Sequence, residues 1–153
     1  TGTAWTKVQR NTAFQNLRYG VFAELIPRDF STRLDVIEQA IPKKTAHLPD
    51  GHDIFGDGSV LAVPLRGHAD GHFGLLFEQL EKPLLYATDT QWVSDALLSE
   101  RRPRLFPRLI SDSFKDITRS CDEVEAFHNA GGNVILCHDD APSPYDYGQE
   151  AVL

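Results

Sequence analysis

Hydrophobic residues recur at three- and four-residue steps in one segment near the C-terminal end of the chain. Within residues 111–132 they are Phe114, Ile117, Cys121, Val124 and Phe127. This spacing places them on one face of a helix. Ser113 can cap the start of that helix, and the Gly-Gly pair at 131–132 can end it. The pattern therefore predicts an amphipathic helix that packs against a core.

Helical signals are weaker in the aromatic-rich first part of the chain. We expect short helices near residues 3–10 and 12–18, followed by irregular chain as far as Pro27. The stretch 29–42 predicts a third helix, because Ser31 or Thr32 can cap its start and Pro42 can end it. The residues expected on the buried face of this helix are Leu34, Ile37 and Ile41.

The period of the pattern changes to that of β-strands after Asp53. Asp57-Gly58 lies between two apolar runs and predicts a tight hairpin, because both turn positions favour positive φ. Further strands are predicted at 72–80, 82–88 and 134–137, the last of them fully apolar and suited to a buried position. This order predicts a sheet with helices packed on at least one face, an α/β layered arrangement.

Length and composition are those of one folded domain. The 153 residues are 41% hydrophobic, which excludes a disordered chain. The formal net charge of −7 argues against nucleic acid or an anionic membrane as a partner, because both require clustered Lys and Arg. A small-molecule substrate is the expected partner. No signal peptide or membrane-length apolar run is visible, and the compartment stays open, with the cytoplasm favoured.

Two cysteines and three strand-end residues are the candidates for chemistry. Cys121 and Cys137 do not make a disulfide framework, and each suits a small buried apolar position. His68, Asp89 and His138 each follow a predicted strand, in LRGHADGH, LYATDTQW and VILCHD. Because the sheet holds strand ends, the loops beyond them can direct side chains to a common point. Imidazole and carboxylate both bind zinc, so the ordered set predicts a metal site, although a single histidine is more often structural.

The stretches PLRGHADGHFGLLF, LLYATD and NVILCHD together resemble the last three metal-ligand motifs of the metallo-β-lactamase superfamily, and especially of its lactonase-like hydrolases. The resemblance covers about residues 50–140 and is specific only as an ordered set. It implies an αββα sandwich with a two-metal centre, zinc being expected and manganese or iron being alternatives. His68 would complete a three-histidine site, Asp89 would bridge the two cations and His138 would bind the second. His72 and Asp139 would orient the ligands without binding metal themselves.

The same resemblance implies a hydrolytic reaction. A metal-activated hydroxide would attack the carbonyl carbon of an ester, lactone, thioester or amide. Aromatic side chains that fall where a lid or pocket wall is expected are Trp5, Tyr19, Phe22 and Trp92. Ordinary core packing is the alternative for each of these four residues. The resemblance therefore implies a substrate class and leaves the individual substrate open.

One departure from the family pattern is large. The first motif of the family, His-x-His-x-Asp-His, has no match in residues 1–67, whose only histidines are His47 and His52. The chain also contains no Met. We therefore expect a single-domain C-terminal portion of a longer hydrolase. Its parts would be a helical lid or packing region at 1–50, the sheet, helix and metal motifs at 51–140, and a tail at 141–153.

The missing motif changes what is expected of the chain on its own. With part of each cation's ligand set missing, the isolated chain is expected to bind metal weakly or not at all and to be inactive. Without its second sheet, it is expected to form a homo-oligomer through the exposed sheet face. Two alternatives remain. One is a non-catalytic binding or scaffolding domain of the same fold, and the other is a generic α/β domain with coincidental histidines.

Overall fold

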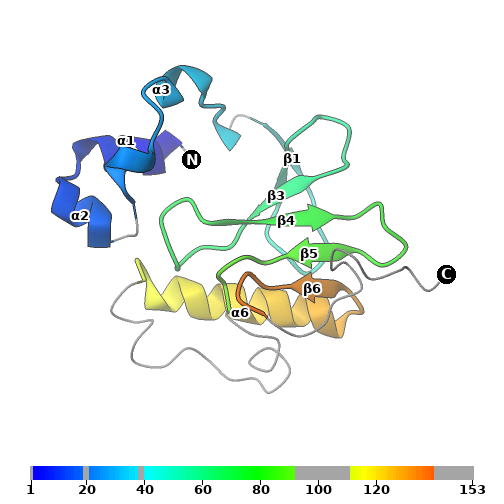
Figure 1. The fold of residues 1–153 in the computed structure, drawn as a ribbon. Helices are drawn as coiled ribbons and strands as arrows, with labels where there is room; N and C mark the ends of the chain where they lie inside the picture. Colours follow the sequence, from blue (N-terminus) through cyan, green and yellow to red (C-terminus); the bar gives the residue numbers. More distant parts are fainter. Residues whose placement is uncertain (1, 19–20, 38–39, 92–110, 140–153) are drawn as a thin grey trace.

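The computed structural model describes residues 2–18, 21–37, 40–91 and 111–139, which form a mixed α+β fold around one open sheet (Figure 1). The sheet has six strands in the order β1-β2-β3-β4-β5-β6. Their bounds are Ile41–Lys43 (β1), Gly51–Asp53 (β2), Leu61–Pro64 (β3), Phe73–Phe77 (β4), Leu84–Tyr86 (β5) and Asn133–Ile135 (β6). The strands predicted on either side of Asp57-Gly58, at 72–80, at 82–88 and at 134–137 are confirmed, whereas no pattern in the sequence predicts β1.

The directions of the strands decide where the candidate ligands lie. β3 and β5 are each antiparallel to β4, and β6 is parallel to β5, so β3, β5 and β6 run in the same direction. Their carboxyl ends therefore meet at one edge of the sheet, the edge from which His68, Asp89 and His138 follow. Neighbouring strands are about 4.8 Å apart, so β4 separates β3 from β5 by about 10 Å.

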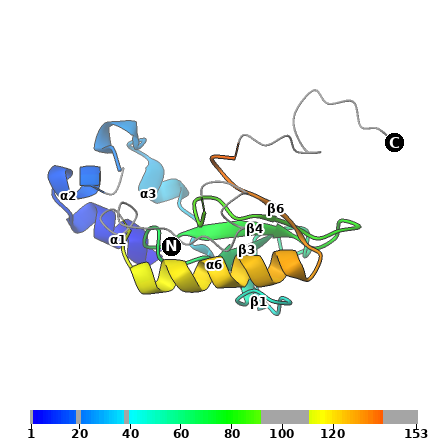
Figure 2. The same ribbon diagram turned by 90° about the horizontal axis from the view of Figure 1, so that it is seen from below.

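The helix α6 (Phe114–Asn129) covers one face of the sheet (Figure 2). Its start is capped as predicted, because the Ser113 hydroxyl accepts a hydrogen bond from the Asp116 backbone N–H at 3.3 Å. The core between helix and sheet contains Leu61, Val63, Leu65, Leu76, Leu85, Ala87, Val124 and Phe127. The predicted amphipathic helix is thus confirmed, and burial of its apolar stripe holds it on the sheet.

The opposite face of the sheet carries a second apolar row. The register places Ala62 beside Leu75, Leu75 beside Tyr86, and Tyr86 beside Ile135. Because side chains alternate along a strand, this row lies on the face away from the core. Within the described ranges, no helix lies over this second face and no second sheet is present (Figure 2).

Short helices form the N-terminal part of the chain, beside the end of the sheet where β3 turns into β4 (Figure 1). They are α1 (Gly2–Arg10), α2 (Ala13–Arg18), the 3₁₀ helix η1 (Ala23–Leu25) and α3 (Phe30–Arg33). The helices predicted near 3–10 and 12–18 are confirmed. None of the helices in the described ranges is both long enough and apolar enough to cross a lipid bilayer.

Three local predictions are wrong. The helix predicted over 29–42 ends at Arg33, and Ile41 instead joins Pro42 in β1. Pro42 is tolerated there because β1 is an edge strand paired only with β2. In the 54–60 connection, positive φ occurs at Gly56 and Gly58 but not at Asp57, so the turn is a longer loop.

The third correction concerns burial of the last strand. The residues of β6 are half-buried, because β6 ends the sheet order and no described strand flanks its outer side. An edge strand has fewer neighbours to pack against than a central strand. The apolar residues of β6 are therefore only half-buried.

Candidate metal centre

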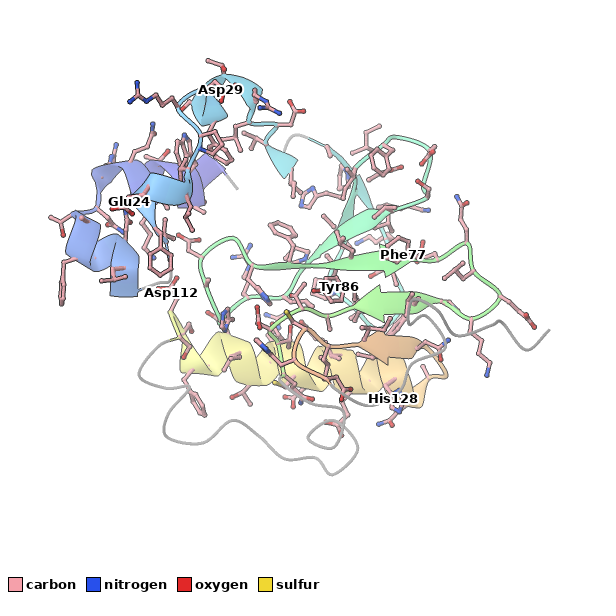
Figure 3. The ribbon with its side chains drawn as sticks, viewed as in Figure 1. Glu24, Asp29, Phe77, Tyr86, Asp112 and His128 are labelled. Atoms are coloured by element: carbon pink, nitrogen blue, oxygen red, sulfur yellow. The ribbon has the colours of Figure 1, made fainter. Side chains whose placement is uncertain are left out.

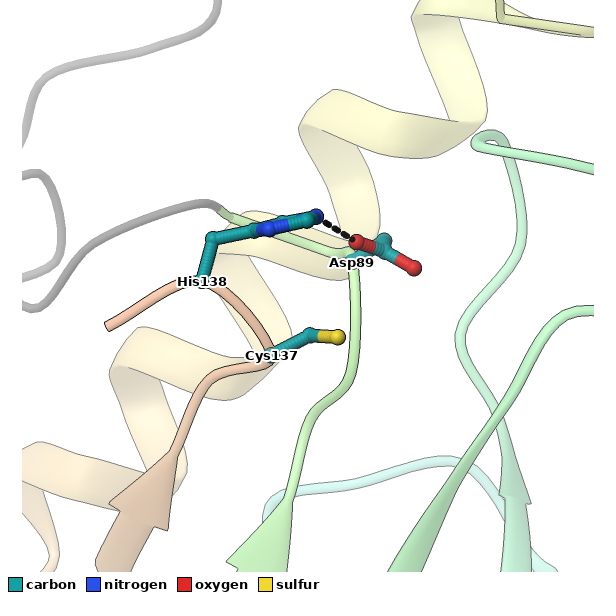
Figure 4. Close-up of side chains that lie close together, drawn as sticks. All are labelled: Asp89, Cys137 and His138. Carbon is teal, nitrogen blue, oxygen red and sulfur yellow. Dashed lines mark ion pairs between the residues drawn. The ribbon is translucent and has the colours of Figure 1, made fainter. Parts of the chain in front are cut away.

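Asp89, Cys137 and His138 bring three candidate ligand atoms together where β5 and β6 end (Figure 4). A carboxylate oxygen, the thiol sulfur and an imidazole nitrogen all lie within 4.8 Å of one another. His138 Nε2 lies 2.9 Å from Asp89 Oδ1, which makes an ion pair when the imidazole is protonated. The sheet thus brings the predicted carboxylate and the predicted imidazole into contact.

Backbone hydrogen bonds beyond the strand ends keep these two loops side by side. The Ala87 N–H donates to the Ile135 carbonyl at 2.8 Å, and the Cys137 N–H donates to the Thr88 carbonyl at 3.1 Å. These bonds extend the parallel pairing of β5 and β6 past the last ladder residues. The backbone alone is therefore enough to keep residues 88–89 beside residues 137–138, and the contact between the Asp89 and His138 side chains is not needed for this.

The ion pair itself is accessible to solvent. The His138 side chain is 61% exposed and the Asp89 side chain is 28% exposed. Water screens such a pair, which therefore contributes little to stability. The two side chains are held near each other mainly by the backbone and can separate at small energetic cost.

Cys137 is the residue of this cluster that the sequence did not predict as a ligand. It was expected to be buried like Cys121, but Cys121 is buried and Cys137 is exposed. The side chain of Tyr86, in β5, is a neighbour of Cys137 (Figure 3 labels Tyr86). The Cys137 thiol, together with partial burial, raises the pKa of Tyr86. The sequence does contain one indication that Cys137 is a candidate ligand, which is its position directly before the strand-end residue His138.

His68 lies at the same edge of the sheet but outside this cluster. It comes after β3, and its ring centroid lies 5.3 Å from that of His72, the residue that precedes β4. Because β4 lies between β3 and β5, the His72 ring occupies part of the space between His68 and the Asp89 loop. The structure therefore brings Asp89 and His138 into contact and leaves His68 beside His72.

Both ring nitrogens of His72 have partners within the protein. Nδ1 lies 2.5 Å from the Leu65 carbonyl oxygen, and Nε2 lies 2.7 Å from Thr88 Oγ1. A carbonyl only accepts, so Nδ1 carries the proton, and in the neutral ring Nε2 accepts from the Thr88 hydroxyl. Burial, helped by the nearby His68 ring, lowers the pKa of His72, which favours this neutral form. These contacts fit the predicted orienting role of His72, because neither nitrogen is available to a metal.

Thr88 connects His72 to the candidate ligand Asp89. Its φ of 49° lies in the left-handed region, which β-branched residues rarely adopt. Besides the contact with His72, its hydroxyl lies 3.2 Å from the Phe73 carbonyl, and its own carbonyl accepts from the Cys137 N–H. The unusual backbone turn at Thr88 sets the direction in which the following Asp89 leaves β5.

The turn that carries His68 is fastened to the start of α6. The Ser113 N–H donates to the Gly67 carbonyl at 3.1 Å, and the Asp112 N–H donates to the His68 carbonyl at 3.4 Å. In return, the Asp112 carboxylate accepts from the Asp70 N–H at 2.6 Å and from Lys7 of α1. Figure 3 shows Asp112 at this end of α6 and His128 at the other.

A cavity of about 370 Å³ lies beside this turn, between it, α1 and the start of α6. Lys7, Asp70, His72 and Asp112 are among the side chains that line it. Asp89, Cys137 and His138 do not line it. The cavity and the ligand cluster are therefore separate features that share only the His72 region.

The other predicted site residues lie in several places. Asp139 directly follows His138 and is half-buried. Trp5 packs on Phe30 of α3, with ring centroids 4.7 Å apart, and Phe22 is 48% exposed. Neither aromatic residue lines the cavity beside the histidine turn. Tyr19 and Trp92 lie outside the residues that the structure describes.

The donor set fits one zinc-type ion. A tetrahedral zinc with bonds of about 2.0–2.1 Å to oxygen and nitrogen holds two such donors about 3.3 Å apart. The present separation of 2.9 Å between His138 Nε2 and Asp89 Oδ1 needs only a small outward shift. With the thiol, three of the usual four positions can be filled. In the described part of the chain, the remaining groups do not assemble a ligand set for a second ion.

Comparisons of the sequence with known proteins did not identify a family for this chain. No protein-family model matches the chain, and no curated protein sequence matches it. Function is therefore inferred from the residues of the site and the sheet that positions them.

Proposed function

We propose that the chain is the C-terminal portion of a metal-dependent hydrolase of the metallo-β-lactamase superfamily that acts on an ester, lactone or similar carbonyl substrate. The observation that supports this proposal is the contact between Asp89 and His138 at two adjoining, parallel strand ends. The turn that carries His68 and His72 lies at the same edge of the sheet. The apolar face opposite α6 is where the second sheet of an αββα sandwich would pack.

Each residue at this edge has a role in the proposed site. Asp89 and His138 would hold a cation, and His68 would contribute from the neighbouring turn. His72 would orient Asp89 through the Thr88 hydroxyl, to which it is hydrogen-bonded. When bound, the metal would supply a Lewis acid that activates water and polarises the carbonyl group.

The remaining ligands of a two-metal centre are absent from this sequence, which has no His-x-His-x-Asp-His motif. We therefore propose that they come from sequence outside these residues and that the isolated chain does not catalyse hydrolysis. The sequence encoded immediately upstream of Thr1 provides the first test. A His-x-His-x-Asp-His motif there supports the hydrolase, and a natural start codon without the motif contradicts it and favours a non-catalytic scaffold.

Kinetics of the extended protein provide the second test, with lactones and aryl esters as substrates and zinc present. Substitution of His68→Ala or Asp89→Asn should lower kcat/KM at least about 100-fold, because each removes a metal ligand. His47→Asn is the matched control: it removes an imidazole from an exposed position with a φ of 64°, which Asn tolerates. Equal activity of all three variants would contradict the proposal.

A further inference from the structure

We propose that Cys137 is a metal ligand and that, with Asp89 and His138, it forms a site at which this chain alone holds one zinc-type cation. The inference deepens the proposed function, on which it rests for the roles of Asp89 and His138. It differs in assigning a third ligand, Cys137, to which the resemblance gives no role. It also replaces the expectation of weak or absent metal binding, because that expectation counted only two of these donors.

The position of Cys137 supports ligation in three ways. Its sulfur lies within 4.8 Å of the candidate donor atoms of Asp89 and His138. The residue is exposed, so an ion can reach it from solvent. Its backbone N–H is bonded to the Thr88 carbonyl, which fixes it beside the Asp89 loop. Figure 4 shows the Cys137 and His138 side chains extending from consecutive positions towards Asp89.

The chemistry of the three donors selects the type of cation. Thiolate sulfur favours zinc, cobalt and similar ions, whereas magnesium, calcium and manganese favour sites made of oxygen atoms. Binding would release the thiol proton of Cys137 to solvent, and His138 would bind as the neutral imidazole. The ion would then replace the direct contact between His138 and Asp89. Water would fill the fourth position of a tetrahedral site.

Tyr86 has the position of an orienting partner for the sulfur. Its phenol group lies near both the Cys137 thiol and the Asp89 carboxylate, which both act on its pKa. A phenol O–H can donate to a thiolate and hold it in one orientation. Such outer partners typically change metal affinity by about 10–100-fold when they are removed. Tyr86→Phe, which deletes only the hydroxyl, should therefore weaken binding by about 10-fold.

Cobalt(II) titration of the 153-residue chain tests the inference directly, because thiolate ligation gives a sulfur-to-cobalt charge-transfer absorption in the near ultraviolet. The wild-type chain should show this absorption and saturate at one cobalt per chain. Cys137→Ser should abolish it. Cys121→Ser is the matched control, because Cys121 is the other cysteine, and a hydroxyl can keep its bond to the Thr90 carbonyl. The control should retain the absorption in full.

Circular dichroism of each variant should show a folded chain, as expected for a change at exposed Cys137. Undiminished charge-transfer absorption in Cys137→Ser would overturn the inference, as would its absence from the wild-type chain. A third outcome is that the wild-type chain binds cobalt without this absorption and that Asp89→Asn abolishes the binding. This outcome would exclude Cys137 as a ligand and would not contradict the proposed hydrolase centre. The hydrolase proposal fails separately, through the activity of the extended protein.

Discussion

Thr88 shows how a single residue can prepare the candidate site. Its left-handed backbone conformation costs about 1–3 kcal/mol and persists only where the surroundings hold it. Here the hydroxyl contacts His72 Nε2, and the carbonyl accepts from the Cys137 N–H. The strain is therefore maintained by groups on two neighbouring elements, and it determines how Asp89 leaves β5.

Thr88→Val should lower the free energy of unfolding by about 1–3 kcal/mol. The substitution takes the hydrogen-bond partner from the half-buried His72 Nε2 and keeps the strained backbone of a β-branched residue. Thr88→Ser is the control, since it keeps the hydroxyl and relieves the branching. The control should change stability by less than about 1 kcal/mol. Urea denaturation of the three proteins measures both effects, and equal losses in the two variants would show that the hydroxyl is unimportant.

The half-buried ring of His72 predicts a pH dependence of stability. Burial lowers its pKa below the ordinary value of 6.5, so between the two pKa values the unfolded chain binds more protons than the folded one. The stabilising contribution is complete above about pH 6.5 and is lost as the pH falls towards the folded pKa.

This dependence can be measured by urea denaturation at about pH 7 and about pH 5. The wild-type chain should lose stability between the two, and His72→Asn should lose less, because the titrating ring is gone. Asn can still donate a hydrogen bond towards the Leu65 carbonyl. The control His47→Asn should keep the wild-type dependence. The same loss in His72→Asn as in wild type would contradict this assignment.

Among the elements, the contact between the histidine turn and α6 is unusually close. A Cβ atom at Gly67 would lie 2.1 Å from the Ile117 backbone nitrogen, and Gly67 has a φ of 118°. Glycine is required here because the turn and the first turn of α6 meet backbone to backbone. The position of His68 therefore depends on the preceding residue, Gly67, having no side chain.

Gly67→Ala should lower the free energy of unfolding by about 3 kcal/mol or more, because it adds a backbone clash to conformational strain. Gly56→Ala is the matched control: Gly56 has a φ of 75°, but nothing lies within 4 Å of its added Cβ. Strain alone should then cost about 1–2 kcal/mol. Thermal or urea unfolding separates the two, and equal losses would argue against the close packing of the turn on α6.

For the whole molecule, the sheet face opposite α6, over which none of the described helices lies, is the feature with the largest expected consequence. Its apolar row includes Leu75, which lies between Ala62 and Tyr86 in the register. Large apolar surfaces that stay open to water tend to become interfaces. We expect the isolated chain to self-associate through this face.

Sedimentation equilibrium should show an oligomer for the wild-type chain and a monomer for Leu75→Glu, which places a charge in the middle of the row. Leu80→Glu is the control, because Leu80 is 44% exposed in the turn between β4 and β5, outside the row. The control should stay oligomeric. A monomeric wild-type chain, or dissociation by both substitutions equally, would contradict association through this face.

Much of the fold was predictable where a local pattern and its burial agree. The stripe from Ile117 to Phe127, with its Ser113 cap, defined α6 closely. The strands between Leu61 and Tyr86 followed from their apolar runs. The predicted helix over 29–42 failed where a residue distant in sequence determines the backbone conformation. Ile41 fits a helical pattern but pairs with Asp53 in the sheet, and no local signal indicates that pairing.

The sequence by itself determined that His68, Asp89 and His138 each follow a strand, because strand periodicity is a local property. Tertiary structure alone decided which of them meet. The parallel pairing of β5 with β6 joins Asp89 to His138 and adds Cys137, while β4 keeps His68 a strand away. Contact between distant residues depends on which strands pair and in which direction. Side-chain periodicity along one strand carries no information about that choice.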